Sequence, residues 1–177
     1  MRKMKDFFAL IEARRSVRAF ESRPVEPAWI EKILRAAQRA PSAGNLQAYE
    51  VVIVRHPETI RALAGLCYNQ SFIAQAPVVL VFCADPARSS AKYGPKGETL
   101  YAVQDATIAA AYAELAVAAL GLATCWVGAF DEAELIRRLH LRPGLRPIAV
   151  FPVGWPAEQP PRTPRRPYEE VVHEYRP

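Results

Sequence analysis

The segment from 99 to 120 constrains the fold of this chain more than any other, because it is typical of a helix that is apolar almost all round. Alanine dominates it, at positions 106, 109, 110, 111, 113, 116, 118 and 119. A helix without a polar face must be covered on every side, which is difficult for a chain of 177 residues, the size of a single domain. We therefore predict one domain (1–177) with a central helix, ended by Gly121, that also forms a subunit interface.

A run of prolines is the second constraint. Six prolines lie between residues 152 and 167, at positions 152, 156, 160, 161, 164 and 167. Proline cannot donate a backbone hydrogen bond, so we expect neither an internal strand nor a helix there. The pattern predicts an extended C-terminal arm (152–177) that lies on another surface.

The rest of the chain alternates between helical and strand patterns. Helices are predicted at 4–13, 27–40, 57–67 and 131–139, and strands at 49–54, 78–84, 124–127 and 148–153, with a loop at 85–97. By itself this alternation predicts a doubly wound parallel sheet. The glycine-rich nucleotide loops of such folds are absent from the sequence. Side chains would therefore have to bind any phosphate.

Cysteine, histidine and hydropathy patterns exclude several classes. The three cysteines lie far apart and the three histidines have no metal-ligand spacing, so we expect neither a disulfide framework nor a metal site. The basic N-terminus does not fit a signal peptide, and the longest uncharged stretch, 115–130, is too short to span a bilayer. We expect a soluble cytoplasmic protein.

The charge is uneven along the chain. Basic residues are in excess in 1–40 and 137–177, acidic residues in 41–136, and the net charge is +5. The first basic end contains RRSVRAF (14–20), where Arg14, Arg15, Ser16 and Arg18 could bind a phosphate monoester through guanidinium and hydroxyl donors. A solvated basic patch after a helix is the alternative interpretation.

Three further segments carry candidate binding residues. In APSAGNLQAYEVVIV (40–54), Asn45 has a donor and an acceptor and could bind the edge of a pyrimidine or isoalloxazine ring. In GLATCWVGAF (121–130), Gly128 and Ala129 would let the backbone approach a flat ligand, and Cys125 fits a core residue better than a nucleophile. In PRTPRRPYEEVV (161–172), Arg162, Arg165 and Arg166 lie on the arm. An ordinary helix–strand loop and a basic tail are the alternatives for the first and the last.

Together the four segments resemble the FMN-dependent nitroreductase family, in the same order from about residue 14 to 172. RRSVRAF resembles the family's RRS-x-R-x-F signature, APSAGNLQ its APS-x-x-NxQ block, GLATCWVGAFDE the block that lines the flavin, and RPYEEVV its C-terminal R-x-P-x-EEVV arm. The sequence departs from the family pattern at Ala48-Tyr49, where Pro-Trp is usual. For the inserted pair of helices of longer members, it offers only the loop 85–97 and the start of the next helix as candidates.

The resemblance implies an α+β fold, with a mixed, mostly antiparallel sheet flanked by helices and a C-terminal arm swapped onto the partner subunit. It implies a homodimer with two FMN sites at the interface. Arg14, Arg15, Ser16 and Arg165 would then lie near the FMN phosphate and ribityl chain, and Arg18 at the pyrimidine end of the ring. Pro41, Ser42 and Asn45 would come from the partner. Gln70 and the backbone of Trp126, Val127, Gly128 and Ala129 would contact the ring.

The activity implied is that of an oxidoreductase in which NAD(P)H reduces nitroaromatics, quinones or flavins by ping-pong hydride transfer through flavin N5. In this scheme the flavin carries the chemistry, while Arg18 and the Ala129 backbone give electrostatic support. Three alternatives remain: a flavoenzyme of the same fold with dehalogenase, dehydrogenase or flavin-fragmenting chemistry; a flavin-binding protein without turnover; and a basic nucleic-acid-binding module. The acidic middle of the chain argues against the last, so we expect small-molecule partners, no nucleic acid and no membrane.

Overall fold

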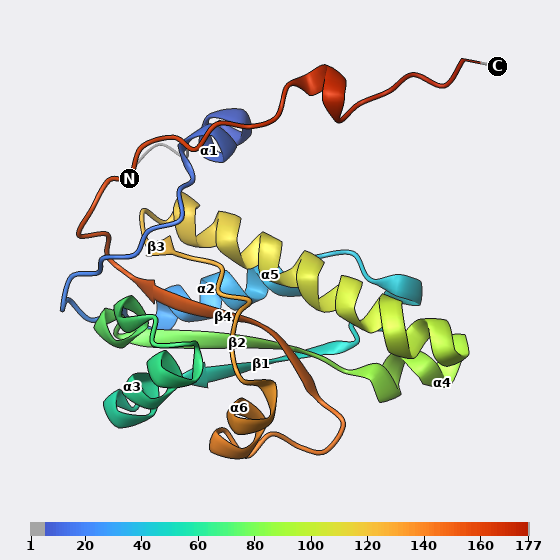
Figure 1. Cartoon of the computed structure of the whole chain (residues 1–177), viewed down its shortest axis with the longest axis horizontal. Helices are drawn as coiled ribbons and strands as arrows, with labels where there is room; N and C mark the ends of the chain where they lie inside the picture. Colours follow the sequence, from blue (N-terminus) through green and yellow to red (C-terminus); the bar gives the residue numbers. More distant parts are fainter. Residues whose placement is uncertain (1–5, 177) are drawn as a thin grey trace.

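A four-stranded antiparallel sheet forms the centre of the protein in the computed structural model, which describes residues 6–176 (Figure 1). The order is β1 (Tyr49–Val54), β2 (Val78–Ala84), β4 (Arg146–Gly154) and β3 (Ala123–Thr124). An isolated parallel bridge joins Ser16 to Thr124 and makes the arrangement mixed. The mostly antiparallel α+β sheet is confirmed. The doubly wound parallel sheet predicted from alternation alone is wrong, since neighbouring strands run in opposite directions.

Helices cover both faces of this sheet. On one face lie α2 (Pro27–Gln38) and α5 (Ala102–Ala119), and on the other α3 (Pro57–Leu66) and α6 (Glu132–Arg138) (Figure 1). Strand β2 is buried at every position. Its residues Val78, Leu80 and Phe82 pack towards α2 and α5, whereas Val79, Val81 and Cys83 pack towards α3 and α6. The period of two in a strand therefore serves two hydrophobic cores.

Helix α5 is buried along only one of its sides. Ala106, Ala109, Ala110 and Ala113 are completely buried against α2 and the sheet. Tyr112, on another side, is 42% exposed. The single chain therefore leaves uncovered part of a helix that the sequence predicts to be covered all round.

Segment 85–97 is helical, which corrects the predicted loop. Helix α4 (Pro86–Lys96) begins with Pro86 in its first turn, and the side chain of Asp85 accepts a hydrogen bond from the Arg88 backbone N–H. Gly94, with φ of +57°, and Pro95 interrupt it near its end. A π-helical turn (Gly97–Tyr101) then leads into α5. Because glycine and proline lie inside the helix, the composition of this segment resembles that of a loop.

Proline inside β4 is the second correction. Pro152 lies opposite Val79 within an internal strand, although the sequence predicts no strand for the proline run. On its other side β4 pairs with β3 only at Val153 and Gly154, so no β3 residue lies opposite Pro152. The predicted strand 124–127 is also shorter, since beyond Thr124 only Val127 forms a bridge, with Val150.

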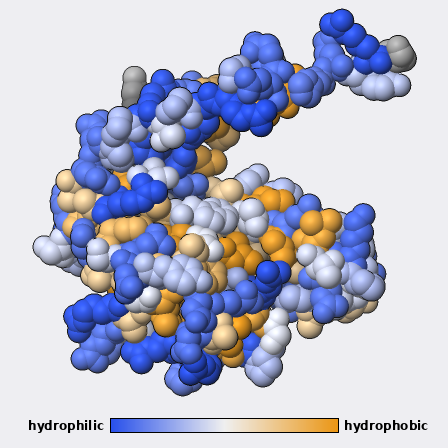
Figure 2. Space-filling model, in the orientation of Figure 1, coloured by the Kyte–Doolittle hydropathy of each residue, from blue (hydrophilic) through white to orange (hydrophobic). Residues whose placement is uncertain are grey.

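Helix α1 (Phe7–Ala13) and the C-terminal arm lie side by side (Figure 1), and Arg162 of the arm pairs with Glu12 of the helix. The helix is shorter than the predicted 4–13, of which residues 4 and 5 lie outside the described part. The C-terminal segment passes α1 and extends away from the sheet, and residues 161–176 are all exposed (Figure 1). The molecular surface is hollowed between these two segments and α5, with hydrophobic side chains in the hollow (Figure 2). No helix in residues 6–176 is long and apolar enough to cross a membrane.

Candidate functional site

Arginines from both ends of the chain line one cavity. Its volume is about 820 Å³, and it lies between residues 11–18 and the arm at residues 160–165. Of the predicted site residues, Arg14, Arg15, Ser16, Arg18 and Arg165 all line it. The folded chain thus brings together the two basic segments that lie almost 150 residues apart in the sequence.

The arginines in this cavity differ in their partners. Arg14 pairs with Glu114 of α5, with 3.0 Å between Nη1 and Oε1. Arg15 and Arg165 donate only to backbone carbonyls, those of Glu12 and Arg14 and those of Thr163 and Pro164 respectively. Within residues 6–176, none of Arg15, Arg18 and Arg165 pairs with a carboxylate. The cavity therefore carries unneutralised positive charge and suits an anion with several acceptor oxygens.

The backbone around Ser16 is fixed by the edge of the sheet. Ser16 bridges to Thr124, and the Val17 N–H donates to the Thr124 carbonyl at 3.1 Å. Cys125 follows Thr124 directly and is buried, and its thiol donates to the Trp126 carbonyl at 3.8 Å. Burial raises the pKa of the Cys125 thiol, which keeps it neutral and a poor nucleophile.

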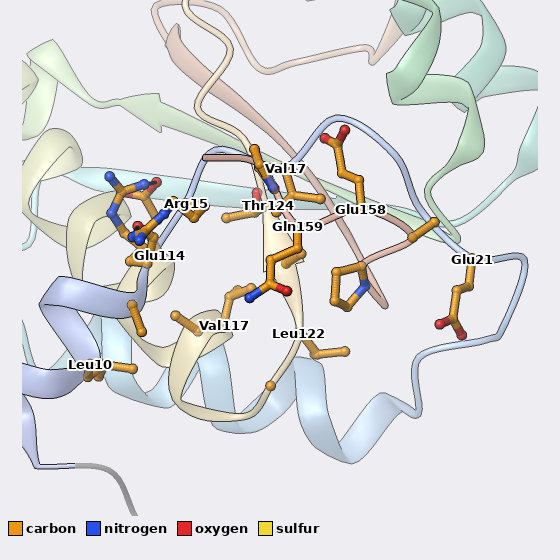
Figure 3. A pocket seen from close by; sticks show the side chains of 18 residues that line it. Leu10, Arg15, Val17, Glu21, Glu114, Val117, Leu122, Thr124, Glu158 and Gln159 are labelled. Carbon is orange, nitrogen blue, oxygen red and sulfur yellow. Dashed lines mark hydrogen bonds and ion pairs between the residues drawn. The ribbon is translucent and has the colours of Figure 1, made fainter. Parts of the chain in front are cut away.

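A second cavity of about 680 Å³ adjoins the first and shares Arg14 and Arg15 with it. Figure 3 shows the side chains of Arg15 and Glu114 at one side of this cavity and that of Glu21 at the other, with Gln159 from the arm between them. The Glu158 carboxylate accepts a hydrogen bond of 2.5 Å from the Arg18 backbone N–H. Contacts of this kind hold the beginning of the arm against the arginine segment.

A separate part of the predicted site is built around Gln70 and the segment that follows β3. The Gln70 side-chain amide donates to the carbonyls of Cys67, at 2.9 Å, and Ala129, at 3.4 Å. Trp126 packs edge-on against Phe151, with ring centroids 5.1 Å apart, which anchors the segment to the sheet. Val127 is buried, whereas Gly128 and Ala129 are exposed and leave their backbone accessible to a ligand.

The third part is the turn that contains Pro41, Ser42 and Asn45. Its backbone is tied to α5 by Asp105, whose carboxylate accepts from the N–H groups of Ala43, at 2.8 Å, and Ala48, at 3.2 Å. Asn45 is exposed at the tip. The turn does not line the arginine cavity of its own chain.

The distance between the turn and the arginine cavity can be judged from their contacts with helix α5. The turn contacts α5 at Asp105, whereas Arg14 contacts it at Glu114. At 1.5 Å per residue, the two contacts are roughly 14 Å apart along the helix. A single protomer therefore holds the predicted residues as separate groups.

Sequence reasoning did not identify Glu114, Asp105 or Gln47 as parts of the site. Asp105 gave a usable signal, because a carboxylate inside an apolar helix requires partners and is rarely buried without them. Glu114 gave none, since its contact with Arg14 depends on how distant segments pack. Gln47 gave none either, since its local contacts with Ser42 and Asn45 depend on the backbone conformation of the turn.

A family model described as the nitroreductase family matches residues 11–71 and 64–155 of the chain. A protein of Methanothermobacter thermautotrophicus, described by the names NADH dehydrogenase and NAD(P)H nitroreductase, is 35% identical over 88% of this chain and 80% of its own length. The FMN reductase [NAD(P)H] of Bacillus subtilis is 32% identical over 97% of this chain and 74% of its own length.

Solved structures agree with this match. The oxidoreductase YcnD of Bacillus subtilis has a TM-score of 0.89 at 32% identity, over 97% of this chain and 74% of its own. The NADPH:FMN oxidoreductase of Vibrio harveyi, solved with NAD⁺, has a TM-score of 0.88 at 28% identity, over 96% of this chain and 77% of its own. About a quarter of each of these two structures has no counterpart in the present chain.

Proposed function

The chain belongs to the nitroreductase family, and from this membership we propose that it is an NAD(P)H-dependent oxidoreductase with FMN as its cofactor. The finer proposal is that NAD(P)H reduces the cofactor and that a nitroaromatic, a quinone or a free flavin then takes the electrons. The observation that carries the assignment is the cavity in which Arg15, Arg18 and Arg165 meet, none of them paired with a carboxylate of residues 6–176.

The residues present fit the cofactor. The phosphate of FMN is a dianion with three acceptor oxygens, and guanidinium groups without a carboxylate partner are suited to bind it. The exposed backbone at Gly128 and Ala129 suits a flat ring. When bound, FMN would supply the hydride chemistry, which no side chain of this protein provides.

The chain's own residues would bind and orient. Arg14, Arg15, Ser16 and Arg165 would hold the phosphate and the ribityl chain. Gln70 holds the Ala129 carbonyl at 3.4 Å and so fixes the strip of backbone on which the ring would lie. Arg18 would stabilise the negative charge that the ring gains on reduction.

The complete site requires a second copy of the chain. Within one protomer the turn of Asn45 lies far from the arginine cavity along α5, so we propose a homodimer in which the turn of one copy completes the cavity of the other. The uncovered side of α5, where Tyr112 is 42% exposed, supports a subunit interface.

The arm has a docking site of matching chemistry. A groove of about 670 Å³ runs between α2 and the edge strand β1, and its lining includes Ile30, Leu34, Val51 and Ile53 as well as Arg55 and the ion pair of Arg35 with Glu31. Near the end of the arm, Val171 and Val172 are 59% and 47% exposed and follow Glu170. We propose that the arm of one copy lies in this groove of the other, which would bury the valines and bring the acidic side chain of Glu170 to Arg55.

The absorption spectrum of the purified protein tests the assignment. We expect the visible band of bound flavin, and rapid bleaching of that band by NADH or NADPH without oxygen. Bound flavin that neither nucleotide bleaches would instead indicate the same fold with another chemistry or with no turnover. A colourless protein that binds no added FMN would overturn the proposal.

A further inference from the structure

The turn that carries Asn45 has an unusual backbone. Gly44, Asn45 and Gln47 have φ values of +56°, +58° and +46°, all in the left-handed region. Residues with side chains adopt this region at a cost, and persist in it where the surrounding structure holds them. Asn45 and Gln47 both adopt it within three positions, so we expect contacts that hold the backbone of the turn in place.

Buried and local contacts both fix it. Asp105 is 2% exposed, and each of its carboxylate oxygens accepts one backbone N–H, from Ala43 and from Ala48. The Ser42 hydroxyl oxygen accepts from the Gln47 backbone N–H at 3.0 Å. Asp105 thus joins both ends of the turn to α5, while Ser42 spans it. The hydroxyl proton of Ser42 is left to donate elsewhere.

The Gln47 side chain fixes the direction of the Asn45 amide. Its Nε2 atom donates to the Asn45 backbone oxygen at 2.9 Å and to Asn45 Oδ1 at 2.5 Å. A backbone carbonyl only accepts, so Gln47 must present its NH₂ group at this position. Asn45 must then meet that group with Oδ1, which leaves its Nδ2 donors turned away. Among residues 6–176, no partner accepts from this Nδ2 atom.

We propose that Gln47 and Asp105 are positioning residues that make this turn a surface of hydrogen-bond donors. Asn45 presents NH₂, and Ser42 retains a hydroxyl proton. The turn therefore recognises an acceptor, such as a ring carbonyl oxygen of FMN, and discriminates against an N–H at the same place. This inference rests on the proposed function for the identity of the ligand. It narrows the sequence expectation, in which Asn45 could meet either a donor or an acceptor.

The first test measures FMN affinity by quenching of flavin fluorescence on the FMN-free protein. Asn45→Asp and Gln47→Glu both replace the presented NH₂ by an oxygen, the second because a glutamate turns the Asn45 amide around. We expect each to weaken FMN binding about tenfold, the usual effect of one unmade hydrogen bond. Because the Asn45→Asp protein has no NH₂ group left to position, adding Gln47→Met to it should weaken FMN binding no further.

A further variant separates amide direction from charge. Gln47→Met adds no charge and keeps a similar volume but frees the Asn45 amide to rotate, so an intermediate loss is expected. Unchanged affinity for Gln47→Met or for Asn45→Asp would overturn the proposal.

The second test needs no flavin. In the FMN-free protein, the side-chain amide protons of Gln47 should exchange with solvent more slowly than those of exposed Gln38, measured by NMR. Asp105→Asn should speed exchange of the Ala43 and Ala48 amides at least tenfold. Equal exchange rates for the two glutamines would refute the inference that Gln47 fixes the direction of the Asn45 amide. If the original protein binds no FMN, the proposed function is refuted. Slow exchange of the Gln47 amide would still show that Gln47 fixes the direction of the Asn45 amide.

Discussion

Replacing Arg165 by alanine tests whether the two ends of the chain form one anion site. Arg165 lies on the exposed arm, and its guanidinium donates to the carbonyls of Thr163 and Pro164, at 3.0 and 3.4 Å. Both acceptors belong to its own segment, and water can replace the lost donor there. Removal should therefore change the free energy of unfolding by less than about 0.5 kcal/mol.

The effect on FMN should be much larger. A hydrogen bond between a guanidinium and a phosphate contributes about 1.5–3 kcal/mol, and no carboxylate in residues 6–176 competes for Arg165. The dissociation constant should rise roughly 10- to 150-fold. The loss should be smaller at high salt, because screening has already weakened the contact in the original protein.

Arg166 is the matched control for this experiment. It neighbours Arg165 on the arm, but its guanidinium bonds to Glu170, with 3.3 Å between Nε and Oε2, and it does not line the arginine cavity. Arg166→Ala removes the same charge from the same segment, and FMN affinity should change less than threefold. Titration of FMN into the flavin-free proteins gives both constants. An Arg165→Ala protein with unchanged affinity, or equal losses for the two variants, would refute the predicted phosphate site.

Four other results are expected. Arg18→Ala should lower the midpoint potential of bound flavin more than it weakens binding, measured by redox titration, because a cation stabilises the charge gained on reduction; an unchanged potential would exclude this role. Burial raises the pKa of Cys67 to about 11, that of Cys83 to about 12, and that of Cys125 above its usual value. The folded protein should therefore resist iodoacetamide at pH 8. Because unfolded thiols ionise first, stability should be complete below about pH 9 and fall as pH rises towards 12, measured by urea unfolding. Truncation after Gln159 should raise the dissociation constant of the dimer, measured by sedimentation analysis, and an unchanged constant would exclude the arm from the interface.

Local sequence signals predicted the strands well and their pairing badly. The bounds of β1 and β2 match the predicted strands 49–54 and 78–84, because β-branched runs between breaking residues are local features. Strand direction is set by how helices pack on the sheet, which no local pattern contains. For α4 the sequence contained a capping residue, Asp85, but Gly94 and Pro95 favoured the prediction of a loop over that of a helix.

In the candidate site, too, local groups of residues could be predicted from the sequence, whereas contacts between distant segments could not. Arg14, Arg15, Ser16 and Arg18 are adjacent in the sequence, so their grouping could be predicted directly. The contact of Asp105 with the turn depends on which side of α5 meets it, and the contact of Glu114 with Arg14 depends on where α1 ends. Both could only be found from the folded chain.

The position of the arm follows from the charge of the cavity. Every residue of the arm from 161 to 176 is exposed, so this segment buries little apolar surface against its own protomer. It nevertheless brings Arg165 to a cavity that already contains Arg15 and Arg18. Like charges in one cavity repel each other, and an anion that binds all three converts this repulsion into attraction. Binding of the phosphate and placement of the arm are then coupled. The cofactor would hold the arm in position, and the contact of the arm with the second copy of the chain requires that position.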